Sequence, residues 1–465
     1  MTFDYDTYLS PFTWRYGSQE MRRIWSEAHK RRLWRQVWVV LAETQAEFGL
    51  VTPEQVADLK AHADQIDVPR ALEIEAEIHH DLMAELRLFA EQALLGGGVL
   101  HLGATSTDIE DNADVLRLSG SLDLLLPQLD ALLRHFADQI EAYADLPLIA
   151  FTHLQPAEPS TLGYRLAQYA QDLSMDREAL LTSRTSLRGK GFKGAVGTGA
   201  AYAELVGADR LEEFEQKLST RLGLPFFPVA TQVYPRKQDY QIIAALAGLG
   251  GSLYKFAFDL RLLQSPSVGE LSEPFGGRQV GSSALPFKRN PINAEKIDSL
   301  ARALAQMPRL AWDNAAHSLL ERTLDDSANR RSLLPEAFLI ADELLRVADR
   351  ILTGLQVNEK AIRHNLEIYA PFAALERVLM ALSKAGADRQ AMHERLRGHS
   401  MQAWGAVQAG KPNPLSQNLG QDEEIQRYLG EVDIAGLMDV THHLGDAPRR
   451  ARKLAESIRQ QVAAG

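Results

Sequence analysis

The sequence has 465 residues, of which 45% are hydrophobic and 24% charged, with a formal net charge of −11 and no cysteine. This composition is typical of soluble globular proteins, and the acidic balance argues against a nucleic-acid-binding or anionic-membrane surface. The absence of cysteine excludes disulfides, thiolate metal sites and thiol nucleophiles.

The first ten residues, MTFDYDTYLS, are acidic and lack the apolar core of a secretory signal. No apolar run approaches the roughly 20 residues that a membrane span requires. We therefore expect a cytoplasmic protein. Its length predicts two or three structural units, because single compact cores are smaller.

The clearest periodic pattern predicts one long helix between Val115 and Tyr143. Its apolar residues are separated by steps of three and four, which places them on one helical face. Pro127 lies inside the pattern and is expected to bend the helix without necessarily ending it. The apolar positions are Val115, Leu118, Leu122, Leu125, Leu129, Leu132, Phe136, Ile140 and Tyr143.

Weaker stripes cover 162–187, 240–263 and 294–320, the last interrupted by Pro308, whereas alternating strand patterns are scarce. These features predict an all-α fold with a core of long helices. We expect an N-terminal helical domain (1–108), a central long-helix bundle (109–357) and a C-terminal helical domain (358–465). Stripes this long usually need several chains to cover them, so we expect a homo-oligomer whose core helices form a multi-subunit bundle.

Three loop-like segments interrupt the helical patterns, at 96–107, 189–199 and 266–291. The third is long and rich in glycine, which suits a mobile lid over a site. The residues GKGFKG at 189–194 match a dinucleotide-binding fingerprint, but they follow a helical stripe instead of a strand. A flexible or anion-contacting loop is the favoured interpretation.

Neighbouring histidines, as in His79–His80–Asp81, raise the question of a metal site. Adjacent helical residues point about 100° apart and do not converge on one ion, and the zinc motif HExxH is absent. We expect no metal.

Chemically rich residues concentrate in four stretches. For Ser160 and Thr161, and for Thr105 and Ser106, helix capping is an alternative to a functional role. A lone His153 is more often structural than catalytic. The stretches are HLGATSTDIEDN at 101–112, FTHLQPAEPSTLG at 151–163, GSSALPFKRNP at 281–291 and ERTLDDSANRR at 321–331.

Taken together, these stretches resemble the fumarase, aspartase and argininosuccinate lyase superfamily, whose members eliminate fumarate or related acids. KRNP at 288–291 and ERTLDDSANRR resemble its adenylosuccinate lyase branch, particularly the animal-type sequences, as do WRYGSQEM at 14–21 and the segment 34–49. The resemblance implies a cofactor-free enzyme that releases fumarate from two small-molecule nucleotides. These are adenylosuccinate, which gives AMP, and succinylaminoimidazole carboxamide ribotide, which gives the carboxamide ribotide.

The resemblance also implies roles in catalysis. Ser282, on the lid, matches the general base, and His153 matches the general acid that protonates the departing nitrogen. Glu295 matches the carboxylate that orients this histidine. Lys288, as a catalytic residue, and Asn290 are expected to bind the succinyl carboxylates and stabilise the developing negative charge.

Other matched positions are expected to bind the remainder of the substrate. Thr105 and Ser106 resemble carboxylate contacts, and Gln232 resembles a further substrate contact. His80 matches a catalytic histidine near the phosphate end, with Asp81 beside it as a substrate-binding residue. The phosphate contacts implied by the resemblance are Arg15, Tyr16, Arg322, Ser327 and Arg331.

Family members are homotetramers in which different subunits contribute to each active site, and we expect the same here. Two alternatives stay open. Another superfamily lyase, such as argininosuccinate lyase, would keep Ser282 and His153 without needing the phosphate cluster. A non-catalytic helical oligomer would need none of these residues. For Arg330, an ion pair with Asp325, Asp326 or Glu321 is the alternative to phosphate binding.

Overall fold

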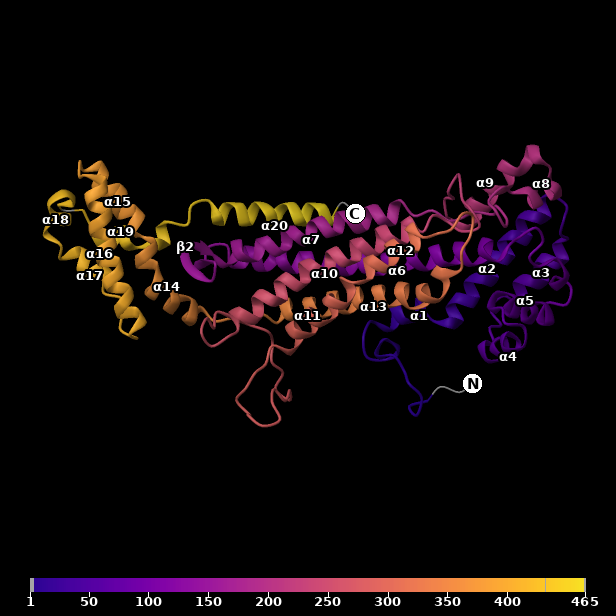
Figure 1. Cartoon of the computed structure of the whole chain (residues 1–465), viewed down its shortest axis with the longest axis horizontal. Helices are drawn as coiled ribbons and strands as arrows, with labels where there is room; N and C mark the ends of the chain where they lie inside the picture. Colours follow the sequence, from indigo (N-terminus) through magenta and orange to yellow (C-terminus); the bar gives the residue numbers. More distant parts are fainter. Residues whose placement is uncertain (1–3, 431, 464–465) are drawn as a thin grey trace. The chain divides into compact units, whose positions relative to one another are not determined.

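The computed structural model describes residues 4–430 and 432–463, and helices make up most of it (Figure 1). The predicted all-α class is confirmed. The chain folds into two compact units. Unit 1 comprises residues 1–129, 176–251 and 299–346, and unit 2 comprises 130–175, 252–298 and 347–465. The domain boundaries expected near 108 and 357 stay a prediction.

Long helices pass along the chain from one unit into the other. Apolar stripes were expected at nearly the positions of four of these helices, but none was expected at 325–353. These helices are α6 (Ser106–Ala142), α7 (Leu162–Thr185), α10 (Lys237–Leu263), α11 (Ile292–Leu304) and α13 (Asp325–Thr353).

Helix α6 confirms the strongest sequence pattern. Its stripe from Val115 to Ile140 is fully buried, and Tyr143 follows the end of the helix. The helix continues through Pro127, as expected. The stripe at 294–320 is divided between α11 and α12 (Met307–Ala316), because Pro308 occupies the first turn of α12, where a missing N–H costs no hydrogen bond.

In unit 1, serine, threonine and aspartate side chains cap several helices. Ser18, Ser26 and Thr52 accept hydrogen bonds from the first turns of α1, α2 and α3. The other elements of this unit are η1 (Pro11–Thr13), α1 (Gln19–Ile24), α2 (Glu27–Glu47), α3 (Pro53–His62), α4 (Val68–Ile78), α5 (Asp81–Gln92), η2 (Gly97–Val99), α8 (Ala200–Val206), η3 (Ala208–Arg210) and α9 (Leu211–Leu222).

The loop at 189–199 is an ordered part of unit 1. Lys190 Nζ lies 2.5 Å from Asp108 Oδ1, with both side chains fully buried, and Lys193 pairs with Glu215. The loop was expected to be flexible or to contact an anion. The expectation of a flexible loop is wrong, because buried ion pairs hold the loop in place. The loop does contact an anion, but that anion is the chain's own Asp108 carboxylate, which also accepts from the N–H groups of Lys193 and Gly194.

Unit 2 contains strands that the sequence did not predict. Strands β1 (Pro147–Thr152) and β2 (Gln155–Thr161) form an antiparallel hairpin, and β3 (Leu271–Ser272) pairs with β4 (Gln356–Val357). Thr161 Oγ1 accepts a hydrogen bond from Tyr164 N at the start of α7, which confirms the predicted cap.

The C-terminal helices of unit 2 gather around their own apolar cluster, which includes Val378, Leu382, Leu415 and Ile425 (Figure 1). The elements around this cluster are α14 (Glu359–Ala373), α15 (Leu375–Lys384), α16 (Arg389–Gln408), α17 (Leu415–Gly420), α18 (Glu423–Leu429), α19 (Ile434–Met438) and η4 (Val440–His442). Helix α20 (Ala447–Ala463) lies apart from it and pairs with α6 through Arg452 and Glu141.

Among the described residues, one helix, α10, is long and apolar enough to cross a membrane by length and composition alone. This corrects the expectation that no such stretch exists. Its most apolar window is 44% buried inside the protein, and core helices of bundles pass the same test.

Candidate functional site

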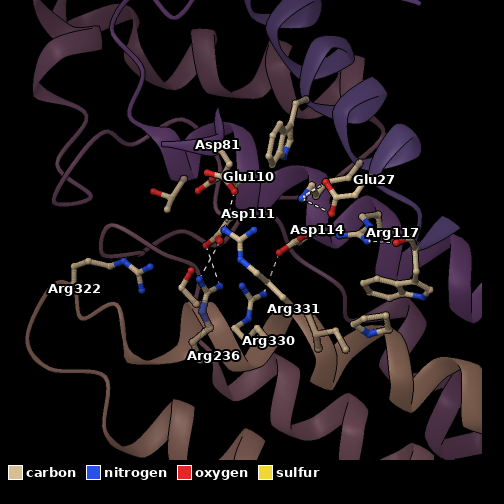
Figure 2. A pocket seen from close by; sticks show the side chains of 17 residues that line it. Glu27, Asp81, Glu110, Asp111, Asp114, Arg117, Arg236, Arg322, Arg330 and Arg331 are labelled. Atoms are coloured by element: carbon tan, nitrogen blue, oxygen red, sulfur yellow. Dashed lines mark hydrogen bonds and ion pairs between the residues drawn. The ribbon is translucent and has the colours of Figure 1, made fainter. Parts of the chain in front are cut away.

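Unit 1 contains a charged cavity of about 120 Å³ (Figure 2). Typical ligand pockets measure ~300–1,000 Å³, so the cavity has room for only part of a nucleotide. It is lined by Trp25, Glu27, Lys30, Trp34, Asp81, Thr107, Glu110, Asp111, Asp114, Arg117, Arg236, Arg322, Ser327, Arg330, Arg331, Leu334 and Pro335.

Two helices supply most of the charge. The carboxylates of Glu110, Asp111 and Asp114 project from the first turns of α6, while Arg330 and Arg331 lie in the second turn of α13. Figure 2 shows the guanidinium groups of Arg236, Arg330 and Arg331 reaching toward these carboxylates from the opposite side. The cavity is thus a meeting of acidic and basic side chains from segments far apart in the sequence.

Arg236 is committed to the walls of the cavity. Its two terminal nitrogens donate to the Asp111 carboxylate at 3.0 and 3.1 Å, and Nε donates to Asp326 at 2.6 Å. Burial and the neighbouring Arg330 act to lower the pKa of Arg236, but Asp111 and other acidic partners outweigh them and raise it. Arg236 therefore stays charged and holds α6 against the start of α13.

Arg330 is also an internal group. Its guanidinium donates to Asp239 and to the Tyr234 hydroxyl, both at 2.8 Å, and lies 3.3 Å from Asp114. The ion-pair alternative for Arg330 is thus correct in kind, but the pair is buried and its partners are Asp239 and Asp114 instead of Asp325, Asp326 or Glu321.

Arg331 and Arg322 are more accessible to a ligand than Arg236 and Arg330. Arg331 is 57% exposed and donates to Asp81 at 2.7 Å, and Arg322 donates to Asp326 at 2.8 Å. Each guanidinium has five donors, so most of their hydrogen-bonding capacity remains for a bound anion. Together with Ser327, these sequence-predicted substrate residues line one cavity.

Glu110 lines the same cavity and was missed by the sequence analysis. Burial and the carboxylates of Asp81, Asp111 and Asp114 raise the pKa of Glu110 to about 8, against a smaller opposing effect of Arg331. Glu110 is therefore mostly protonated at neutral pH. The sequence DIEDN at 108–112 shows several acidic residues at the start of a predicted helix. It does not show that Asp81 of α5 and Arg331 of α13 lie near Glu110, because folding brings these segments together.

His80 and Ser106 come together at the edge of this region. His80 begins α5 as its N-cap, and its Nδ1 accepts weakly from Met83 N at 3.5 Å. Its Nε2 lies 3.4 Å from Ser106 Oγ. Thr105 donates its backbone N–H to Asp108 Oδ2 at 3.0 Å, so this residue takes part in the capping of α6.

Gln232, Arg15 and Tyr16 lie outside the cavity lining. The Gln232 N–H donates to Glu321 O at 3.1 Å, and its carbonyl accepts from Thr107. The segment after Tyr16 is fixed to α13 further along, since Gly17 N donates to Glu343 at 3.2 Å. The lining of the cavity therefore includes neither Arg15 nor Tyr16, and their contact with a phosphate stays a prediction.

In unit 2, His153 lies at the tip of the β1–β2 hairpin. His153 and Leu154 have φ values of 53° and 57°, the left-handed region that a two-residue turn requires and that glycine or asparagine normally fills. Holding a histidine and a leucine there costs conformational energy. Such strain is common where a side chain must project for function.

Ser282 lies in the lid segment of unit 2, in a tight turn. Its Oγ accepts hydrogen bonds from the backbone N–H groups of Ala284 at 3.3 Å and Leu285 at 3.0 Å. Asn290 Nδ2 donates to Gly281 O at 3.0 Å, which ties the two ends of this turn. Lys288 follows in the same turn, with its N–H bonded to Leu285 O.

The base of the lid is held by buried Glu273. Its carboxylate accepts from the N–H groups of Asn293 and Ala294 at the start of α11, and its own N–H donates to Gln264. Glu295, on α11, lies 4.0 Å from Arg261. Among the described residues of unit 2, no hydrogen bond joins Glu295 to His153, so this pairing stays a prediction.

The chain matches the family described as “Lyase” over residues 6–305 and the family described as “Adenylosuccinate lyase C-terminus” over residues 371–454. It is 35% identical to adenylosuccinate lyase of Schizosaccharomyces pombe, covering 99% of this chain and 96% of that one. It is 39% identical to adenylosuccinate lyase of Schistosoma mansoni, covering 90% and 88%.

The solved structure of 3-carboxy-cis,cis-muconate lactonizing enzyme from Pseudomonas putida is similar in fold, with a TM-score of 0.85, 26% identity and coverage of 97% of this chain and 99% of that chain. The two adenylosuccinate lyases are similar in sequence to this chain over 90–99% of its length. The chain belongs to the adenylosuccinate lyase family.

Proposed function

We propose that this chain eliminates fumarate from adenylosuccinate, giving AMP, and from succinylaminoimidazole carboxamide ribotide, giving the carboxamide ribotide. The observation that carries the proposal is the charged cavity, which is lined by Arg322, Ser327 and Arg331. The two guanidinium groups there have N–H donors that no acceptor in the described part of the chain uses. A phosphate suits forked guanidinium donors. The relatives named adenylosuccinate lyase support the same substrate.

In the proposed reaction, Ser282 Oγ removes a proton from the succinyl carbon next to a carboxylate. A serine oxygen is a weak base unless negative charge on it is stabilised. The two N–H groups directed at Ser282 Oγ supply such stabilisation, because hydrogen bonds to a charged form favour that form. Lys288 and Asn290 bind the carboxylates and stabilise the charge that develops on them.

His153 completes the elimination as the general acid. As the carbon–nitrogen bond breaks, its electron pair stays on the purine-side nitrogen, which takes a proton from His153, and the carbon pair left by deprotonation forms the double bond of fumarate. The strained hairpin tip supports this role, since it leaves His153 exposed to solvent. The remaining residues expected to bind substrate are part of the same proposal.

We further propose a cytoplasmic homotetramer whose active sites combine residues of different subunits. Two inactive variants test this arrangement. Ser282→Ala and His153→Gln should each abolish turnover, and a mixture that is dissociated and reassembled should regain part of it. Failure of reassembled tetramers to regain activity, or an active monomer, would contradict shared sites.

Turnover itself is tested by fumarate release from adenylosuccinate, with argininosuccinate as the comparison substrate. Faster release from adenylosuccinate is expected, because only this substrate carries a phosphate for the arginine cavity. Faster release from argininosuccinate would favour the other superfamily activity. No release from either substrate would favour a non-catalytic helical oligomer.

A further inference from the structure

Glu110 occupies an unusual position within the proposed phosphate cavity. It lines the cavity beside Arg331, yet no hydrogen bond joins its side chain to any described residue. Its neighbours on α6 differ in this respect, since Asp111 binds Arg236 and Asp114 binds Arg117 and Arg330. The Glu110 carboxyl group is therefore free to contact a ligand.

The charges around Glu110 disfavour an ionised carboxylate. Arg331 donates to Asp81, and its charge offsets only a small part of the effect that burial and the nearby carboxylates have on Glu110. An ionised Glu110 would repel both Asp81 and an incoming phosphate. A protonated Glu110 removes this repulsion and provides an O–H donor. Charge-assisted O–H···O⁻ hydrogen bonds are among the strongest in proteins.

Charged groups face Glu110 from each wall. Helix α2 contributes Glu27 and Lys30, α5 contributes Asp81, α6 contributes Asp111, Asp114 and Arg117, Arg236 precedes α10, Arg322 precedes α13, and Arg330 and Arg331 lie on α13. Burial acts to lower the pKa values of Arg236, Arg330 and Arg331, but their acidic partners outweigh it and raise them, so these three arginines stay charged. Burial acts to raise the pKa of Asp81, but its partner Arg331 and other cations outweigh this effect and lower that pKa. Asp111 and Asp114 are paired with Arg236 and Arg330.

We propose that Glu110 is a further nucleotide-binding residue, which as a neutral carboxylic acid donates its O–H to the substrate phosphate beside Arg331. The inference rests on the proposed function, because it assigns the phosphate to this cavity. It adds a proton requirement that the arginines alone do not impose. Since burial and the neighbouring carboxylates raise the pKa of Glu110 to about 8, binding is favoured below this pH and weakened above it.

The test measures the affinity of AMP for the purified oligomer by calorimetry from pH 7 to 9.5 at constant ionic strength. The phosphate is already doubly ionised over most of this range, since its second pKa is about 6. Wild-type affinity should fall above pH ~8, toward tenfold per pH unit, because one proton is required. Glu110→Gln keeps an N–H donor without a titrating proton, so its affinity should stay nearly constant.

The matched control is Glu336→Gln. Burial also raises the pKa of Glu336, on α13, but this residue does not line the cavity. The control should therefore retain the wild-type decline. A Glu110→Gln variant that declines like wild type, or a wild-type affinity that is constant to pH 9.5, would overturn the inference.

Fumarate release by the same preparations separates this inference from the proposed function. Release of fumarate with an unchanged profile in Glu110→Gln would refute only the role of Glu110. Absence of release, together with proton-dependent AMP binding that Glu110→Gln abolishes, would refute only the proposed reaction.

Discussion

The buried pair of Lys190 and Asp108 allows a quantitative prediction about the loop at 189–199. Both side chains are inaccessible to solvent, and Lys190 Nζ also donates to Gly194 O at 3.0 Å. Replacing one member of a buried pair usually costs 3–5 kcal/mol, because the other charge is left without its partner. Lys190→Met should therefore strongly destabilise the loop.

The expected magnitude lies near the lower end of that range. After the substitution, Asp108 still accepts from the N–H groups of Thr105, Lys193 and Gly194. A cost of about 3 kcal/mol corresponds to roughly 150-fold faster hydrogen exchange of the loop amides, if exchange follows local opening. Mass-spectrometric hydrogen exchange over 189–199 measures this change directly.

A double variant provides the control. Lys190→Met combined with Asp108→Asn removes the orphaned charge while leaving an oxygen acceptor, so it should exchange more slowly than Lys190→Met alone. If Lys190→Met changes exchange by less than about fivefold, which is about 1 kcal/mol, the buried pair does not hold the loop. Equal exchange in the single and double variants would show that the remaining Asp108 charge is not the cause.

Three further predictions concern other parts of the chain. Arg331→Ala should weaken AMP binding by roughly 10- to 150-fold, since hydrogen bonds to charged groups contribute about 1.5–3 kcal/mol. Arg309→Ala, which removes an exposed ion pair outside the cavity, should have little effect on AMP binding. Calorimetry with AMP measures both affinities. Leu154→Gly should stabilise the hairpin by about 1 kcal/mol, because Leu154 is 70% exposed and its φ is 57°; faster hydrogen exchange over 147–161 would contradict this. Burial acts to raise the pKa of Asp422, but hydrogen bonds from Arg395 and His399 outweigh it and hold that pKa below its usual range. The hydrogen bonds from Arg395 and His399 to ionised Asp422 therefore stabilise the C-terminal helices above pH ~4, and this contribution is lost as the pH falls further. Asp422→Asn should be less stable than wild type at pH 7 and should lose less on acidification, and parallel acid profiles would contradict the assignment.

The helices were predictable because burial on one face imposes a period on the apolar residues, and this period is visible in their order along the sequence. In α6, the stripe from Val115 to Ile140 is fully buried. The β1–β2 hairpin was not predictable in this way. Its two strands are short and only partly buried, and its turn holds His153 and Leu154 where glycine or asparagine would have indicated a hairpin.

The candidate site was predictable only in part, and for a related reason. The resemblance singled out Arg322 and Arg331, and the fold places both in one cavity. It gave no reason to select Glu110, whose properties depend on carboxylates from α5 and α6 brought close by folding. It also did not separate Arg331, which is exposed, from Arg330, which is buried among acidic partners.

The central claim is most directly tested by following adenylosuccinate, AMP and fumarate together, with purified protein in the presence of a chelator. The account predicts that AMP and fumarate appear in equal amounts as adenylosuccinate disappears, and that neither appears with Ser282→Ala. Intact adenylosuccinate after prolonged incubation with the wild-type oligomer would contradict the account.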